Sequence, residues 1–196
     1  MNNEFRAGLP AEIRAEGETV KVSGYAAVFN QETEIGGSYR EVIAPGAFAE
    51  AIGRDDVVFV INHEGLPLAR TRSGTLTLRE DEKGLYMETE LDPTDPDVMS
   101  ILPKMRRGDL DKMSFAFSPS QQDWDESGET PLRTIRKASL YDVSIVTSPA
   151  YEGTDIGLRS LEEHRAANAP EIEAQSSAVN ASRMRMKLSL SETKTG

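Results

Sequence analysis

The chain has 196 residues, of which 38% are hydrophobic, and its formal net charge is −11. This length predicts one domain, and the modest apolar content predicts that part of the chain lies outside the core. The acidic balance argues against nucleic acid as a main partner, because phosphate binding needs clustered Lys and Arg. The sequence contains no cysteine, which excludes disulfides, a thiol nucleophile and zinc–thiolate sites.

The sequence shows no membrane or export signal. No apolar run approaches the length of a membrane span. The first residues lack the basic start and the apolar core of a signal peptide. A cysteine-free composition also suits a reducing cytosol. We therefore expect a soluble cytoplasmic protein that has no membrane partner.

The first half of the chain predicts short strands joined by polar turns. Residues 12–15 and 19–23 flank Gly17 and predict a hairpin. Residues 31–39 predict a loop, and Pro45 begins a short predicted helix. Further strands, expected from alternating or continuous apolar residues, cover residues 25–29, 40–43, 56–61, 75–79 and 85–91.

A longer helix is expected after Asp95, whose side chain would cap it, with Pro96 at its first position. Apolar residues at i, i+3, i+4 and i+7 predict one buried face on this helix. These residues are Val98, Ile101, Leu102 and Met105. Pro103 lies inside the pattern and should kink or interrupt the helix, and Gly108 should end it.

Two further strands contain the residues of greatest chemical interest. Residues 112–119 alternate aromatic and small side chains, and this pattern predicts a half-buried strand in which Ser114 faces a side lined by small residues. A polar excursion over residues 121–131 should separate it from a second strand over residues 133–146, which contains Asp142. With seven to nine short strands and two helices, the fold should be a mainly antiparallel β-barrel or sandwich surrounded by helices.

The composition changes after about residue 161. From there the chain is rich in Ala, Glu, Ser and Asn and has almost no large apolar residue. We therefore expect a folded domain over residues 1–160 and a polar tail over residues 161–196 that is disordered or marginally helical. A basic amphipathic stretch over residues 183–190 is either a solvated part of the tail or a docking segment for an acidic or apolar partner.

The chain has only two histidines, His63 and His164. His164 lies in the polar tail, whereas His63 directly follows a buried strand, where a rigid element can hold a catalytic group. One such histidine and no cysteine argue against a transition-metal site made by the protein alone. The sequence also lacks an EF-hand spacing, a phosphate-binding loop and a Gly-x-Ser-x-Gly elbow.

The remaining chemistry is hydrolysis by a serine and a histidine. The Ser114 hydroxyl becomes a nucleophile only when a base accepts its proton, and His63 is the candidate base. Asp142 is the candidate third residue, because a carboxylate among apolar neighbours needs a partner. Two simpler interpretations stay open at this point. Ser114 could be small filler in its strand, and Asp142 could form a salt bridge with an arginine.

Several short motifs between about Pro10 and Leu161 occur in the order found in one protein family. They cover residues 24–30, 40–48, 62–63, 70–76, 106–110, 113–117 and 140–151. In these motifs the sequence resembles the prohead maturation proteases of tailed bacteriophages, which are distantly similar to herpesvirus assemblin proteases. The resemblance implies an assemblin-like fold for residues 1–160, namely a closed antiparallel β-barrel of about six to eight strands surrounded by helices.

The resemblance also implies roles for individual residues. The family's serine matches Ser114, and its histidine matches His63. Assemblins use a second histidine as the third residue, and the corresponding strand here has Asp142, where phage relatives often have Glu. A loop after this strand, at Ala150 and Tyr151, would supply backbone donors to the oxyanion. The resemblance implies no metal, nucleotide or other cofactor.

The activity implied by the resemblance is that of a serine endopeptidase. Its substrate would be the scaffolding segment of the phage major capsid protein, or a separate scaffold protein, and the protease itself. It would act in the host cytoplasm inside the procapsid, and a homo-oligomer is compatible with this role. The tail over residues 161–196 would serve as a packaging tether, as a self-cleavage region, or as both. The rival hypothesis is a non-catalytic capsid assembly or scaffolding protein on the same fold, and a general esterase is disfavoured because the elbow motif is missing.

Overall fold

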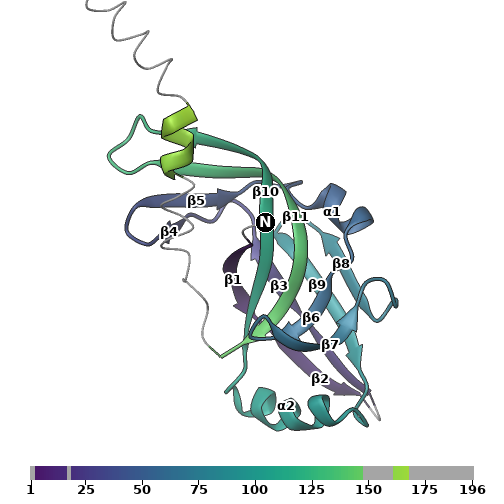
Figure 1. The fold of residues 1–196 in the computed structure, drawn as a ribbon. Helices are drawn as coiled ribbons and strands as arrows, with labels where there is room; N and C mark the ends of the chain where they lie inside the picture. Colours follow the sequence, from purple (N-terminus) through teal and green to yellow (C-terminus); the bar gives the residue numbers. More distant parts are fainter. Residues whose placement is uncertain (1–2, 17–18, 148–160, 168–196) are drawn as a thin grey trace, which may run out of the picture. The chain divides into compact units, whose positions relative to one another are not determined.

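The computed structural model describes residues 3–16, 19–147 and 161–167. The chain divides into two units, Met1–Gly157 and Leu158–Gly196, and residues 161–167 of the second unit form a short helix. Figure 1 shows the strands and helices of the first unit. In chain order they are β1 (Glu4–Pro10), β2 (Glu12–Glu16), β3 (Thr19–Val28), β4 (Thr33–Ile35), β5 (Tyr39–Ile43), α1 (Ala49–Arg54), β6 (Val58–Ile61), β7 (Glu64–Arg70), β8 (Leu76–Glu80), β9 (Gly84–Leu91), α2 (Pro96–Arg107), β10 (Lys112–Asp125) and β11 (Leu132–Val146).

The strands form two sheets. The larger sheet has the order β1-β10-β11-β5-β4, and β6 joins it by pairing with β11 on one side and β7 on the other. The smaller sheet has the order β2-β3-β9-β8 and is antiparallel throughout. In the larger sheet β10 and β11 form a long antiparallel hairpin, whereas β11 runs parallel to both β5 and β6. Figure 1 shows β10 and β11 as the two long green strands that cross the molecule.

The expected closed antiparallel barrel is wrong, although the structure is mainly β with helices. A barrel closes when the first and last strands of one sheet pair with each other. Among the described strands the two sheets instead end at free edges, β1, β4 and β7 in the larger sheet and β2 and β8 in the smaller one. The physical reason lies in β11, because one edge of this strand pairs with β5 over Leu132–Ile135 and with β6 over Asp142–Ile145. The sheet therefore branches at β11 rather than closing.

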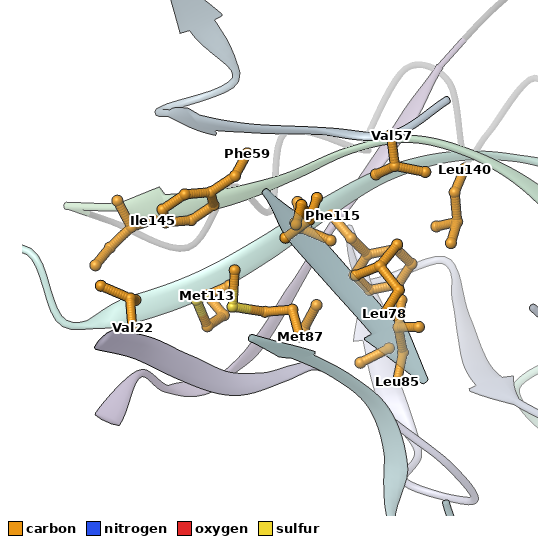
Figure 2. Close-up of a cluster of buried hydrophobic side chains, with 14 of the residues drawn as sticks. Val22, Val57, Phe59, Leu78, Leu85, Met87, Met113, Phe115, Leu140 and Ile145 are labelled. Atoms are coloured by element: carbon orange, nitrogen blue, oxygen red, sulfur yellow. The ribbon is translucent and has the colours of Figure 1, made fainter. Parts of the chain in front are cut away.

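The hydrophobic core draws side chains from both sheets. Figure 2 shows part of it, with Val22, Leu85 and Met87 from the smaller sheet beside residues of the larger one. The Phe115 ring lies edge-to-face against Phe48 at a centroid distance of 5.5 Å and stacks on another phenylalanine at 5.1 Å. Full burial of one such side chain contributes about 2 kcal/mol to folding. The core therefore fixes β10, the strand that also contains Ser114.

Helix α2 follows the sequence pattern closely. Asp95 caps its start, since a carboxylate oxygen accepts the backbone N–H of Asp97 at 2.8 Å, and Gly108 ends it in the left-handed conformation with φ of 79°. The four apolar residues expected to form its inner face are buried. Of the kink or interruption expected at Pro103, the interruption does not occur, because the helix continues to Arg107. Pro103 and Met99, whose carbonyl loses its helical donor, are both exposed, so water can satisfy that carbonyl.

Four features of the strands were not expected from sequence. β1, β4 and β7 fall in segments without clear alternation. β10 continues through the expected polar excursion to Asp125, because it stays paired with β11 as far as the Asp125–Leu132 pair.

In the described part of the chain, no helix combines the length and apolar character needed to cross a bilayer.

Candidate active site

His63 occupies a two-residue turn between β6 and β7. The turn is closed by the pair Ile61–Glu64, and both of its central residues have positive φ, 49° for Asn62 and 61° for His63. Such a turn normally has Asn followed by Gly, because only Gly reaches positive φ without steric cost. A histidine at the second position costs about 1 kcal/mol or more in backbone strain. The turn therefore accepts strain that a glycine would avoid, and it places an imidazole at a fixed point.

Hydrogen bonds tie this turn to the end of β11. The Asn62 backbone N–H donates to the Ile145 carbonyl at 3.0 Å, and the Thr147 N–H donates to the Asn62 side-chain oxygen at 3.1 Å. The His63 backbone N–H donates to the Ser144 hydroxyl oxygen at 3.2 Å. Because β6 also pairs with β11, the backbone of His63 is fixed relative to the side chains of β11.

Ser114 and Asp142 lie on neighbouring strands of the same hairpin. In the register of β10 and β11, Ser114 pairs with Ser144 and Ala116 pairs with Asp142. Ser114 is fully buried at 0% exposure, and the Asp142 side chain is 13% exposed. The strand pairing thus sets the spacing between the hydroxyl and the carboxylate before any side-chain contact is considered.

The structure brings His63, Ser114 and Asp142 into one line of hydrogen bonds. His63 Nδ1 lies 2.6 Å from Asp142 Oδ1, and His63 Nε2 lies 2.7 Å from Ser114 Oγ. A carboxylate can only accept, so the Asp142 contact places the ring proton on Nδ1. Nε2 is then free to accept the proton of the Ser114 hydroxyl. The polar partners of Asp142 among the described residues are His63 and Ser144, rather than the arginine of the simpler interpretation.

Ser144 belongs to the same group of side chains, and sequence reasoning missed it. Its hydroxyl donates to Asp142 Oδ1 at 2.7 Å, and its oxygen lies 3.1 Å from His63 Nδ1. The residue is fully buried. The signal that could have found it is its position two residues after Asp142, which puts both side chains on the same face of β11.

The edge strand β1 also contacts the site. It pairs with β10 so that Ala7 lies opposite Ser114, and the Ser114 hydroxyl is 2.8 Å from the carbonyl oxygen of Arg6. The Phe5 ring packs on the His63 ring at a centroid distance of 4.4 Å. The Ser114 hydroxyl therefore has two acceptors within reach for one proton, namely the Arg6 carbonyl and His63 Nε2.

A buried cluster of two glutamates and two arginines lies next to this contact. The Arg6 guanidinium binds Glu41 at 2.6 Å and Glu4 at 2.7 Å, and Arg133 reaches the same two carboxylates at 2.9 and 2.7 Å. Burial by itself raises the pKa of Glu4, but the hydrogen bond and charge of Arg133 and the charge of Arg6 outweigh it, so the pKa lies below its usual range. The charges cancel within the cluster, which joins β1 to β5 and β11.

The other residues named from sequence fall outside this group. Ala150 and Tyr151, expected near the oxyanion, lie outside the described residues. His164 lies in the short helix of the second unit. Within residues 3–16, 19–147 and 161–167, no three His, Asp or Glu side chains converge in a way that could hold a metal ion.

A serine, a histidine and a carboxylate in line is the arrangement of the serine hydrolases, in which the histidine accepts the proton of the attacking hydroxyl. Here all three residues lie on strands or a turn of the larger, open β-sheet. The chain belongs to the caudovirus prohead serine protease family, whose model matches residues 9–167. The family expected from the sequence motifs is therefore confirmed.

Two individual relatives agree with this assignment. The chain is 32% identical over 151 residues to the prohead protease of Enterobacteria phage HK97, and the match covers 74% of this chain and 62% of that protein. It thus spans less than two thirds of the length of that curated relative. The fold is similar to the capsid assembly protease of bacteriophage T4, with a TM-score of 0.50 at 10% identity over 75% of this chain and 98% of that one. At this identity the likeness concerns the fold alone.

Proposed function

We propose that this chain is a serine endopeptidase in which Ser114 is the nucleophile, His63 the general base and Asp142 the residue that orients the base. The observation that supports the proposal is the unbroken line of hydrogen bonds from Asp142 through His63 to Ser114, at 2.6 and 2.7 Å. A merely structural serine in a strand needs neither an imidazole in a strained turn nor a buried carboxylate behind that imidazole.

The reaction begins when Ser114 Oγ forms a bond to the scissile carbonyl carbon. Its proton moves to His63 Nε2, and the carbonyl π electrons move to the oxygen, which becomes an oxyanion. Asp142 stabilises the resulting imidazolium. When the C–N bond breaks, His63 returns the proton to the leaving amine. Water then repeats the sequence on the acyl-enzyme, with His63 as base, and releases Ser114.

The oxyanion needs backbone N–H donors close to the reacting carbonyl. The resemblance to assemblins assigns them to the loop after β11, near Ala150 and Tyr151. Thr147, the residue after β11, already donates its backbone N–H to Asn62 at 3.1 Å, so the loop starts beside the histidine turn. This location supports the assignment.

The proposed substrate is the scaffolding segment of the phage major capsid protein, or a separate scaffold protein, together with this chain itself. Membership of the prohead protease family supports a role in the prohead, inside the infected host cell. The name of the HK97 relative points to the same stage of capsid assembly. Self-cleavage would give the polar tail over residues 161–196 a role as a removable segment.

The test is to incubate the purified chain with uncleaved capsid precursor and to follow the fragments by mass spectrometry. Cleavage is expected for the wild type and for His164→Ala, the matched histidine control, and not for Ser114→Ala or His63→Ala. Purified Ser114→Ala is also expected to be longer than the wild type, because it cannot cleave itself. Cleavage that persists in Ser114→Ala would refute the assigned nucleophile. A wild type that binds the precursor without cleaving it would favour the scaffolding hypothesis.

A further inference from the structure

Ser144 is a fully buried hydroxyl that the mechanism above does not use. It contacts His63 twice, at the backbone N–H and beside ring Nδ1, and it donates to the Asp142 carboxylate. We propose that Ser144 is a positioning residue, which fixes the ring and the carboxylate of the site relative to each other. The proposal rests on the proposed function, because positioning matters only if His63 acts as the base.

The proton inventory supports one assignment for Ser144. Its single hydroxyl proton goes to Asp142 Oδ1 at 2.7 Å, because the other two neighbours of its oxygen are N–H groups. The lone pairs of the same oxygen accept the His63 backbone N–H at 3.2 Å and share the Nδ1 proton at 3.1 Å. The hydroxyl proton and the lone pairs of Ser144 therefore all have hydrogen-bond partners. It is also no rival nucleophile, because it lies beside Nδ1 rather than beside Nε2, the nitrogen that accepts a proton.

Positioning is needed here because the turn that contains His63 is strained. Its left-handed backbone at φ of 61° is unfavourable for histidine, so a contact from β11 has to hold it in place. Asp142 Oδ1 accepts from Nδ1 and from Ser144 at once, and this fixes which carboxylate oxygen faces the ring. Without Ser144 the carboxylate can rotate, and the His63 N–H loses its acceptor.

The test compares Ser144→Ala with Ser139→Ala, a matched change on the same strand whose hydroxyl binds Arg54 instead. For Ser144→Ala we expect kcat on capsid precursor to fall about tenfold or more, the size expected for a lost hydrogen bond to a charged group, with KM unchanged. The low-field NMR resonance of the His63 Nδ1 proton should broaden or disappear in Ser144→Ala and persist in Ser139→Ala. With only two histidines in the chain, this signal can be assigned with His164→Ala.

Retention of both kcat and the Nδ1 resonance in Ser144→Ala would overturn the proposal. A rise in KM at constant kcat would also overturn it, because the residue would then act on substrate binding. The resonance does not depend on turnover. A wild type that fails to cleave therefore refutes the proposed function, while the NMR comparison still decides the role of Ser144.

A second feature leads to an independent inference, because the Ser114 hydroxyl is enclosed. Its exposure is 0%, the Arg6 carbonyl oxygen lies 2.8 Å from Oγ, and the Phe5 ring covers His63. Before attack, a scissile carbonyl carbon has to lie about 3–3.5 Å from Oγ. The backbone of β1 therefore occupies the space that a substrate must enter.

We infer that β1 is an intramolecular cover of the active site, and that an extended segment of substrate protein displaces its first half and pairs with the edge of β10 in its place. Among the described strands β1 pairs only with β10, and its regular register ends at Ala7. Displacement of its first half must also break the buried ion pairs that join Arg6 to Glu41 and Glu4 to Arg133. Its far end is anchored, since Ala11, the residue after β1, donates its N–H to the Asp111 carbonyl at 2.7 Å. Strand addition to a free sheet edge is a common way of binding extended peptides. This inference also rests on the proposed function.

A reversible engineered disulfide tests this inference. Because the chain has no native cysteine, no other disulfide can form. Extending the register by one step beyond the Glu4–Phe117 pair places Asn3 opposite Ser118. A disulfide in Asn3→Cys/Ser118→Cys would pin the first half of β1 to β10. The oxidised protein should react with a fluorophosphonate probe at Ser114 at least ten times more slowly than the same protein after reduction, and the single variant Asn3→Cys should not respond to reductant.

Equal labelling rates before and after reduction would overturn the inference about β1. Cleavage of capsid precursor by the reduced double variant judges the proposed function separately. Labelling that survives Ser114→Ala would count against both, because the probe would then report another residue.

Discussion

Replacing Asp142 by asparagine removes the negative charge behind His63 and keeps the shape of the side chain. Asp142 Oδ1 accepts from His63 Nδ1 at 2.6 Å and from Ser144 Oγ at 2.7 Å. Two donors converge on one oxygen, so in Asp142→Asn they select the amide oxygen over the amide nitrogen at that point. The ring proton stays on Nδ1, and Nε2 can still accept from Ser114. The variant therefore loses the charge and not the tautomer.

The size of the effect follows from the charge separation. For two unit charges at a separation of about 4 Å and an effective dielectric constant of about 20, the attraction is about 4 kcal/mol. This energy corresponds to a factor of about 10³ in the rate of the step in which the imidazolium forms. Asp142→Ala also removes the acceptor of Nδ1–H and is expected to be slower still.

The assay is single-turnover cleavage of capsid precursor by the wild type, Asp142→Asn and Asp142→Ala. The control is Asp109→Asn, since Asp109 is an exposed carboxylate that pairs with Arg107 at 2.7 Å and lies on no catalytic strand. A loss below tenfold in Asp142→Asn would refute the use of the carboxylate charge. Equal rates for Asp142→Asn and Asp142→Ala would refute the conserved tautomer.

Three further predictions concern stability. Phe115→Ala opens a cavity in the core and is expected to lower the free energy of unfolding by about 3–5 kcal/mol, measured by urea denaturation; a loss below about 1 kcal/mol would contradict the core assignment. Gly8→Ala should destabilise the fold, because a Cβ at this position would lie 2.3 Å from the carbonyl oxygens of Tyr25 and Ala26; an unchanged midpoint would show that β1 sits less close to β3. The pKa of Glu4 is lowered on folding, so its contribution to stability is present above its unfolded value near 4.5 and is lost as the pH falls through the lower folded value. Melting temperature measured against pH should fall less steeply on the acid side in Glu4→Gln than in the wild type, and parallel curves would refute the linkage.

The residues of the candidate site could be named from sequence because few alternatives existed. The chain has no cysteine and only one histidine at the end of a predicted strand, so the choice of base was narrow. The alternating pattern around Ser114 placed it on a strand, and that strand is β10. The catalytic roles of these residues stay predictions. Ser144 was missed because its place on the same face of β11 as Asp142 gains meaning only from the histidine turn beside that strand, which the sequence does not reveal.

The arrangement of the sheets could not be predicted from the sequence, for a different reason. Local alternation predicts that a strand exists but not which strand pairs with it. β11 looked like an ordinary strand, yet its parallel pairing with both β5 and β6 is what keeps the larger sheet open. The polar residues at the end of β10 show no apolar period, and they extend the strand only because β11 lies beside them. The helix α2 was predictable in more detail, since its cap, its buried face and its terminal glycine are all local signals.

The position of β11 in the chain determines when the larger sheet can form. It is the last of the described strands to leave the ribosome. β10, β5 and β6 cannot form their pairing with β11 before then. At a synthesis rate of about 5–20 residues per second, a nascent chain holds Ser114 and His63 for a second or more before Asp142 is made. During that interval the turn with His63 has no strand end to dock on. Translation itself therefore delays assembly of the three residues until almost the whole domain has been produced.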